Sequence, residues 1–303
     1  MGREYAVLLV ATLVWGAVHP TVKFALGELS PMQLALLRPA CACFVLMLAV
    51  LASRRAGRLL EELRAAPGTL VLLGVLGFAL SGGLTSLALS YLPAGITSLF
   101  TNTSPLIVVC AGLVLARRQI GHLEVGGALV GFGGLALLTL SDAQLSGDLG
   151  ATLLGTGVAL GSAACWAIYT GLARRLARAD PIVTTALTSA IGSLAVGVVA
   201  LPSQDWGRLV RASTPVLLAT LWAGAVSTGC TYVAWSYALR RLPAVVVAPF
   251  GYLIPVSALT ISHVWLGEPL TLPVVLGGGL VLAGVALTQL NHLRLLRAAS
   301  ARS

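Results

Sequence analysis

The chain has 303 residues, of which 57% are hydrophobic and only 10% are charged, and its mean hydropathy is +0.95. A water-soluble domain of this length could not cover its surface with so few polar groups. The composition therefore excludes a soluble globular protein and predicts an all-α integral membrane protein that has the lipid bilayer as its solvent. The net charge of +9 comes without basic patches interleaved with aromatic residues, so it does not indicate nucleic acid.

Ten apolar stretches run along the chain, each close to the roughly 20 residues that a helix needs to cross a bilayer. Charges and prolines bound them near residues 5–26, 31–51, 67–89, 93–115, 122–140, 151–173, 181–201, 215–239, 243–265 and 270–290. The first stretch lacks a convincing cleavage site and nine more follow it, so we interpret it as a retained helix and not as a secretory signal.

An internal repeat relates the two halves of the chain, because residues 88–140 match residues 238–290 at a shift of 150. The most informative matches are Pro93/Pro243, Phe100/Phe250 and Pro105/Pro255. Five spans per half is an odd number, so the second half must enter the membrane in the opposite direction. We expect ten transmembrane helices in two inverted five-helix repeats, 1–141 and 150–292, with a basic cytoplasmic tail at 293–303. Inverted repeats are typical of transporters.

The positive residues predict the orientation, since Lys and Arg concentrate in cytoplasmic loops. The termini and alternate loops on one side hold 15 of the 19 Lys and Arg residues, whereas the other side holds Lys23, Arg208 and Arg211. Both termini are therefore predicted to lie in the cytoplasm, in a multi-pass protein of the cell (inner or plasma) membrane. Attraction of these residues to anionic lipid accounts for the net charge.

The first span carries a candidate site where Pro20 cannot donate to the carbonyl of Gly16, which should kink the helix beside Trp15 and His19. Polar residues inside a span usually face the interior of the bundle. Trp15 and His19 could therefore line a cavity. Alternatively, His19 bonds to a neighbouring helix and Trp15 fills space.

Arg38 lies inside the second span, about 10 Å from its outer end by helix rise. No span contains a carboxylate that could pair with it. Arg38, with Lys23, could supply positive charge to the outer half of a cavity and favour a carboxylate or phosphate. The alternative is a structural arginine that snorkels to the interface or pairs with Glu28.

The fourth span has a polar run at residues 97–104, which includes Thr101 and Asn102, directly before Pro105. Its repeat mate Pro255 follows Tyr252. Each proline leaves a carbonyl four residues earlier without its donor. Broken helices at equivalent places in two halves are a sequence indication of a substrate site.

Aromatic residues of the sixth and eighth spans could form a cage with Trp15. They are Trp166, Tyr169, Tyr232 and Trp235. Such a cage would suit an apolar or aromatic substrate, or a cation held against ring faces. Trp222 and Tyr237 are better explained as interfacial belt residues.

The fifth and tenth spans are predicted to have a structural role. Glycines repeat along the fifth and tenth spans and would let helices approach closely, with a homodimer contact as the alternative. We expect a monomer or a homodimer. All five cysteines fall within spans, which is no disulfide framework, and we expect no metal site and no cofactor.

The sequence resembles the EamA-type drug/metabolite transporter superfamily over nearly its whole length. The resemblance lies in residues 238–244 (ALRRLPA), in residues 266–271 (LGEPLT) and in Trp15-Gly16 with Pro93-Ala94-Gly95. It implies ten helices in two EamA repeats and transport of metabolites, often as efflux. One departure is that the acidic turn at Glu268 is replaced in the first half by residues 116–118 (ARR).

We therefore predict a carrier, not an enzyme, that exports small metabolites such as amino acids or drug-like compounds by alternating access. A channel or a structural membrane subunit is the alternative, and an intramembrane enzyme is disfavoured because the bundle lacks catalytic carboxylates. The candidate substrate-binding residues are Trp15, His19, Lys23, Arg38, Thr101, Asn102, Trp166, Tyr169, Tyr232, Trp235 and Tyr252. The lack of acids at mid-membrane predicts facilitated diffusion or exchange, with any proton coupling through His19.

Overall fold

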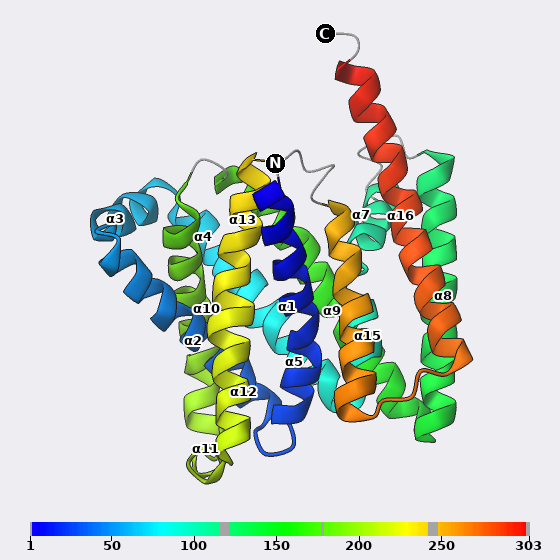
Figure 1. Cartoon of the computed structure of the whole chain (residues 1–303), viewed down its shortest axis with the longest axis horizontal. Coiled ribbons are helices and arrows are strands. Elements are labelled where there is room, and N and C mark those ends of the chain that lie inside the picture. The colour runs from blue at the N-terminus through cyan, green and yellow to red at the C-terminus, as the bar shows by residue number, and fades with distance from the viewer. Residues whose placement is uncertain (1, 115–120, 177–178, 242–247, 301–303) are drawn as a thin grey trace.

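The computed structural model describes residues 2–114, 121–176, 179–241 and 248–300, and every element in these ranges is a helix (Figure 1). Within them, seven helical segments are long and apolar enough to cross a membrane, and shorter apolar helices lie at Phe250–Leu266 and Leu272–Thr288. This confirms the all-α fold class of a membrane-spanning protein.

The first half contains nine elements up to residue 146. They are α1 (Gly2–Ala25), α2 (Pro31–Ala52), α3 (Ala56–Ala65), α4 (Pro67–Leu73), η1 (Gly74–Ser81), α5 (Gly82–Tyr91), α6 (Ala94–Thr101), α7 (Ser104–Val114) and α8 (His122–Ser146). The start of α2 shows why the chain is helical there. Ser30 and Gln33 form a reciprocal capping box, and Pro31 occupies the first helical turn, where its missing N–H costs nothing.

The second half contains the elements from residue 149 onward. They are α9 (Leu149–Ala173), η2 (Arg174–Leu176), α10 (Pro181–Ser203), α11 (Gly207–Arg211), α12 (Thr214–Gly224), η3 (Ala225–Cys230), α13 (Thr231–Arg241), η4 (Ala248–Tyr252), α15 (Leu253–Leu266) and α16 (Leu272–Ser300). Because α16 continues to Ser300, the segment expected to be a separate tail is helical as far as that residue.

Two of the spans contain a π-helical segment in their middle. In the first half, η1 joins α4 to α5, and in the second half η3 joins α12 to α13. The repeat shift of 150 places residues 74–81 on residues 224–231, so the two π segments lie at equivalent positions. Wider π turns inside a helix occur often at functional sites. No residue pattern in the sequence indicates these two segments.

The helix breaks expected near Pro105 and Pro255 are present. Helix α6 ends at Thr101 and α7 begins at Ser104, whereas the 3-10 turn η4 ends at Tyr252 and α15 begins at Leu253. The two interruptions are again equivalent under the repeat, as a proline-induced loss of the backbone hydrogen bond would produce.

The two halves interlock through a pair of matching glycine contacts. A β-carbon placed on Gly224 would lie 2.7 Å from the carbonyl oxygen of Arg38, and one on Gly74 would lie 2.8 Å from that of Thr188. Both glycines and both contacted residues are repeat mates. Helix α2 of the first half therefore packs on α12–η3 of the second, and α10 packs in the same way on α4–η1.

Helices α8 and α16 pack against each other through their glycines. A β-carbon on Gly127 would lie 2.7 Å from the carbonyl oxygen of Gly284, and one on Gly277 would lie 3.1 Å from that of Gly134. These are once more repeat-related contacts. The close helix approach expected from the glycines is present in this pair.

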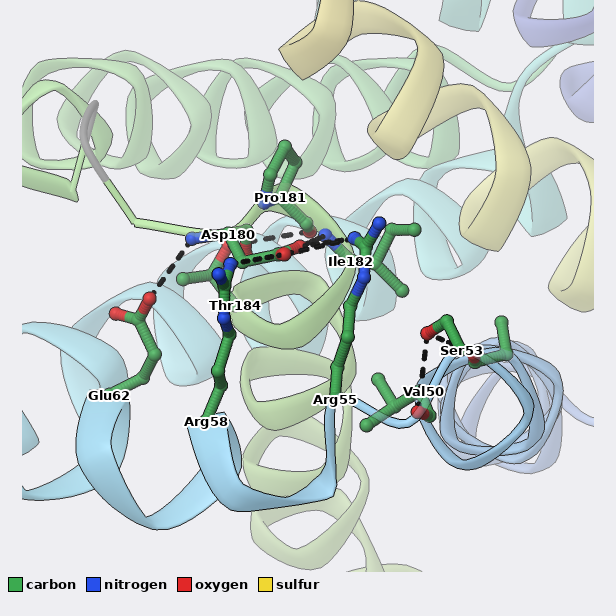
Figure 2. A network of polar contacts seen from close by, with 10 residues as sticks. Val50, Ser53, Arg55, Arg58, Glu62, Asp180, Pro181, Ile182 and Thr184 are labelled. Atoms are coloured by element: carbon green, nitrogen blue, oxygen red, sulfur yellow. Dashed lines mark hydrogen bonds and ion pairs between the residues drawn. The ribbon is translucent and has the colours of Figure 1, made fainter.

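Polar side chains connect the halves at the end of the bundle where both chain ends and α3 lie (Figure 1). Asp180, the N-cap of α10, accepts hydrogen bonds from Arg55 at 2.9 Å and Arg58 at 3.1 Å, and its own N–H donates to Glu62 at 3.0 Å. Figure 2 shows how these side chains reach from α3 and its approach to the start of α10.

The opposite end of the bundle has its own connections between the halves. Ser30 donates to Gln204 at 2.5 Å, and the side-chain amide of Gln33 donates to the carbonyl of Asp205 at 2.8 Å. The carboxylate of Glu28 accepts from both the N–H and the hydroxyl of Ser213, each at 2.6 Å. Side chains therefore join the two halves at both ends.

Candidate functional site

Five of the candidate residues form one aromatic cluster in the middle of the bundle. Trp15 of α1 lies 5.3 Å from Tyr232 and 5.5 Å from Trp235 of α13, centroid to centroid. Trp166 of α9 lies 5.7 Å from Trp15 in an edge contact, and Tyr169 stacks on Trp166 at 4.8 Å and 17°. The structure brings these rings together as the cage interpretation requires, in the offset and edge geometries that aromatic pairs prefer.

Phe78 of η1 also belongs to this cluster, although it was not among the candidate residues predicted from the sequence. Its ring lies 4.9 Å from that of Tyr232 and 6.5 Å from that of Tyr169, and its side chain is buried. The preceding residue must be small, because a β-carbon on Gly77 would lie 2.4 Å from the Tyr169 ring. The glycines around Phe78 were the available signal that this stretch approaches another helix closely.

Arg38 lies beside this cluster, and no described acidic residue pairs with it. Its Nη1 donates to the hydroxyl of Ser86 on α5 at a long 3.4 Å, and its Nε is buried without a hydrogen-bond partner among the described residues. The suggested pair with Glu28 is wrong, because the Glu28 carboxylate binds Ser213 instead.

A small cavity of about 30 Å³ opens next to Arg38. It is lined by Leu34, Ala35, Arg38, Pro39, Gly77, Phe78, Gly82, Thr228 and Tyr232. These residues come from α2, η1 and α5 of the first half and from η3 and α13 of the second. The volume admits water but not a metabolite, so at this cavity the structure is closed.

His19 is buried and its Nε2 lies 3.2 Å from the hydroxyl of Thr101, which in turn donates to the carbonyl of Thr97. The contact joins α1 to the end of α6, as the structural alternative for His19 requires. Its Nδ1 is buried without a hydrogen-bond partner in the described part of the chain. Asn102, the residue that caps the end of α6, donates its side-chain amide to the carbonyl of Ser98 at 2.8 Å.

The partners of Lys23 are main-chain carbonyl oxygens, which the sequence does not indicate. Its Nζ donates to the carbonyl oxygens of Leu89 at 2.6 Å and Leu92 at 2.9 Å, at the C-terminal end of α5, where a cation is favourable. Across the same turn, Glu268 accepts from the N–H groups of Ala94 and Gly95 at the start of α6. Lys23 and Glu268 thus hold the α5–α6 turn.

Tyr252 lies away from the aromatic cluster. It packs against the buried core that includes Leu99 and Val281, and its hydroxyl is buried without a partner in the described ranges. The first-half counterpart of the acidic turn, residues 116–118, and the repeat mates Pro243 and Ala244 lie outside the described residues.

Together these features define a multi-pass membrane protein of two related halves whose irregular helices meet at a central aromatic and cationic site, an architecture used by secondary transporters. The chain belongs to the EamA-like transporter family, whose model matches residues 2–140 and 153–290. The two matched segments are the two halves seen in the structure.

Relatives of similar length support this membership. The chain is 26% identical to an uncharacterized transporter of Archaeoglobus fulgidus, with 93% of this chain and 97% of the relative covered. It is 27% identical to the uncharacterized transporter YvbV of Bacillus subtilis, covering 94% and 91%. It is 26% identical to a probable terminal-alkyne amino-acid exporter of Streptantibioticus cattleyicolor, covering 97% and 95%.

A protein of known crystal structure has the same fold. Its structure superposes with a TM-score of 0.63 at 21% sequence identity, over 95% of this chain and 98% of that one.

Proposed function

We propose that this transporter is a carrier that exports small metabolites, such as amino acids or drug-like compounds, across the cell membrane by alternating access. The observation that carries the proposal is the central cavity, which is lined from both halves where their helices are π-helical at equivalent positions. In proteins of this type two related halves exchange inward-open and outward-open arrangements around a central site. The similarity to a probable amino-acid exporter supports amino acids as substrates.

The same proposal includes ten spans as two inverted repeats, at 1–141 and 150–292, with both termini in the cytoplasm. The start of α1, the end of α16 and the basic helix α3, which carries Arg58 and Arg64, lie at the same end of the bundle (Figure 1), and the positive residues there support this orientation. The aromatic cluster and Arg38 are proposed to contact the substrate. Lys23 is proposed to affect substrate binding indirectly, by fixing the position of the α5–α6 turn.

Counterflow in proteoliposomes tests the carrier mechanism. Purified protein in vesicles preloaded with an unlabelled amino acid should accumulate the labelled form transiently and with saturation, because a carrier returns loaded. Tyr232→Ala should reduce this counterflow, and Leu218→Ala, at an exposed position of α12, is the matched control. Flux that neither saturates nor shows counterflow would indicate a channel.

Export can be tested in cells that express the protein. We expect higher resistance to toxic analogues of the transported amino acids and lower intracellular accumulation of them. Increased sensitivity would mean that the protein imports these compounds.

A further inference from the structure

We propose that the guanidinium of Arg38 is the docking point for a carboxylate group of the transported compound, with the rings of Phe78 and Tyr232 covering its apolar part. This inference rests on the proposed carrier function, and it assigns a substrate class: monoanionic or zwitterionic carboxylates with an apolar side chain. Four observations lead to it.

The first observation is an uncompensated charge. A buried guanidinium in a membrane protein is costly unless an anion or several acceptors satisfy it. Arg38 has one long hydrogen bond to the Ser86 hydroxyl, and no described carboxylate lies within ion-pair distance of it. The missing counter-ion is what a carboxylate ligand would supply.

The second observation comes from the repeat. Thr188 is the mate of Arg38, and it makes the same close backbone contact with Gly74 that Arg38 makes with Gly224. Thr188 is buried, and its hydroxyl donates to the carbonyl of Thr184 in its own helix at 2.8 Å. Helix packing at this position of the repeat therefore does not require a cation. We infer that the charge of Arg38 has a role other than packing.

The third observation is the geometry around the guanidinium. Its Nε is buried without a hydrogen-bond partner among the described residues, and Arg38 lines the cavity together with Phe78 and Tyr232. The Nε–H and a terminal N–H of arginine form a planar fork that matches the two oxygens of a carboxylate. The rings 4.9 Å apart provide an apolar wall next to that fork.

The fourth observation limits the charge of the ligand. Lys23, the other cation considered for this site, is held by the carbonyls of Leu89 and Leu92. Among the described residues that line the cavity, Arg38 is then the only cation. A single positive charge balances a carboxylate but not a phosphate monoester dianion, so the geometry favours the carboxylate.

The test uses purified full-length protein in detergent and measures the midpoint of thermal unfolding. The probes are carboxylates from propionate to 3-phenylpropionate, the amide of each acid, leucine, leucinamide and inorganic phosphate. We expect a saturable rise of the midpoint with the acids and with leucine, and a smaller rise or none with the amides and phosphate. An equal response to acids and amides, or no response to any acid, would overturn the inference.

Variants locate the response. Arg38→Gln should raise the apparent Kd for the acids by roughly 10- to 100-fold, as expected for loss of a charge-assisted hydrogen-bonded pair. Arg38→Lys keeps the charge but loses the fork, so it should retain the preference for acids with weaker binding. Arg58→Gln, a surface arginine at the α3 end, is the matched control and should leave the response unchanged.

The outcomes separate this inference from the carrier proposal. If Arg38→Gln binds acids as the unmodified protein does, the docking role is refuted while counterflow is unaffected. If no compound shows counterflow yet acids bind in an Arg38-dependent way, the site stands and the carrier proposal fails. Should Arg38→Gln not fold, Arg38→Lys decides: equal binding of acids and amides by this variant refutes the role.

Discussion

At the scale of single residues, His19 is a buried ionisable group of α1, one helical turn after Trp15 of the aromatic cluster. Its contact with Thr101 connects α1 to the broken fourth span, at the point where α6 ends. An imidazole titrates near neutral pH when it can reach water. In the closed state described here it is buried, so exchange of a proton would require the bundle to open.

We predict that proton coupling, where present, depends on His19. The flux of a transported amino acid would be measured in proteoliposomes with an imposed pH gradient, for the unmodified protein and for His19→Gln. The substitution should remove any pH-driven accumulation and leave counterflow largely intact, because glutamine can still bond Thr101. Accumulation against a gradient that survives the substitution would contradict the prediction.

Glu28 gives a second residue-scale prediction, because it connects the α1–α2 loop to the start of α12. Hydrogen bonds from the hydroxyl and then from the N–H of Ser213 lower the pKa of Glu28 below its ordinary value. A lowered folded-state pKa means that the contribution to stability is present above the unfolded-state pKa, near 4.3, and disappears as the pH falls through the folded-state pKa.

The measurement is the thermal midpoint as a function of pH for the unmodified protein and Glu28→Gln. The two curves should differ most above about pH 5, where an unpaired carboxylate in the unfolded chain is ionised, and should converge as the pH approaches the folded-state value. A difference that grows on acidification would show that the Ser213 contacts do not stabilise the ionised form.

Part of the site could be predicted from residue types alone. Large aromatics in apolar spans are few, so Trp15, Trp166 and Tyr232 stood out in the sequence. Phe78 did not, because a phenylalanine among aliphatic residues carries no signal of its own. The partners of Lys23 could not be predicted for a related reason. A buried amine needs acceptors, but the main-chain carbonyls at the end of a distant helix have no signature in side-chain identity.

At the scale of helices, the contact between α8 and α16 depends on the absence of side chains. A β-carbon on Gly284 would lie 2.4 Å from the backbone nitrogen of Gly131, whereas one on Gly279 of the same helix would meet nothing within 4 Å. The neighbouring atoms are backbone, which cannot rotate away. Close approach of this kind is how small residues stabilise helix pairs in membranes.

We predict that Gly284→Ala lowers the free energy of unfolding by about 1–3 kcal/mol, the usual cost of overpacking. Gly279→Ala is the control on the same helix and should be neutral or slightly stabilising, because alanine favours helix. Thermal midpoints in detergent would measure both. Equal effects of the two substitutions would mean that α8 and α16 are not held together at this point.

The helix breaks and the π segments show where sequence-based prediction works for this fold. A proline removes a donor at a known position, so the interruptions near Pro105 and Pro255 could be read directly. A π segment involves no obligatory residue. η1 is mostly aliphatic, whereas η3 contains Ser227 and Thr228, so the two segments share no composition that would mark a π turn. The repeat nevertheless places them at equivalent positions.

At the scale of the whole molecule, the orientation in the membrane is a testable consequence of the charge distribution. Single cysteines would be introduced near Arg54 and Ser146 in a background in which the native cysteines are replaced. A membrane-impermeant thiol reagent added to intact cells should label the position near Ser146 and not the one near Arg54. The reverse pattern would show that the termini face outward.

The difference between Arg38 and Thr188 makes the two halves electrically unequal. If α2 shifts along the membrane normal when the carrier reorients, one positive charge moves through part of the membrane field, and a full charge across 100 mV corresponds to roughly 2.3 kcal/mol. A bound monoanionic carboxylate would cancel that charge. With such a substrate, membrane voltage would bias the return of the empty carrier and have little effect on the loaded step, so a carrier built from two related halves would have a preferred direction of transport.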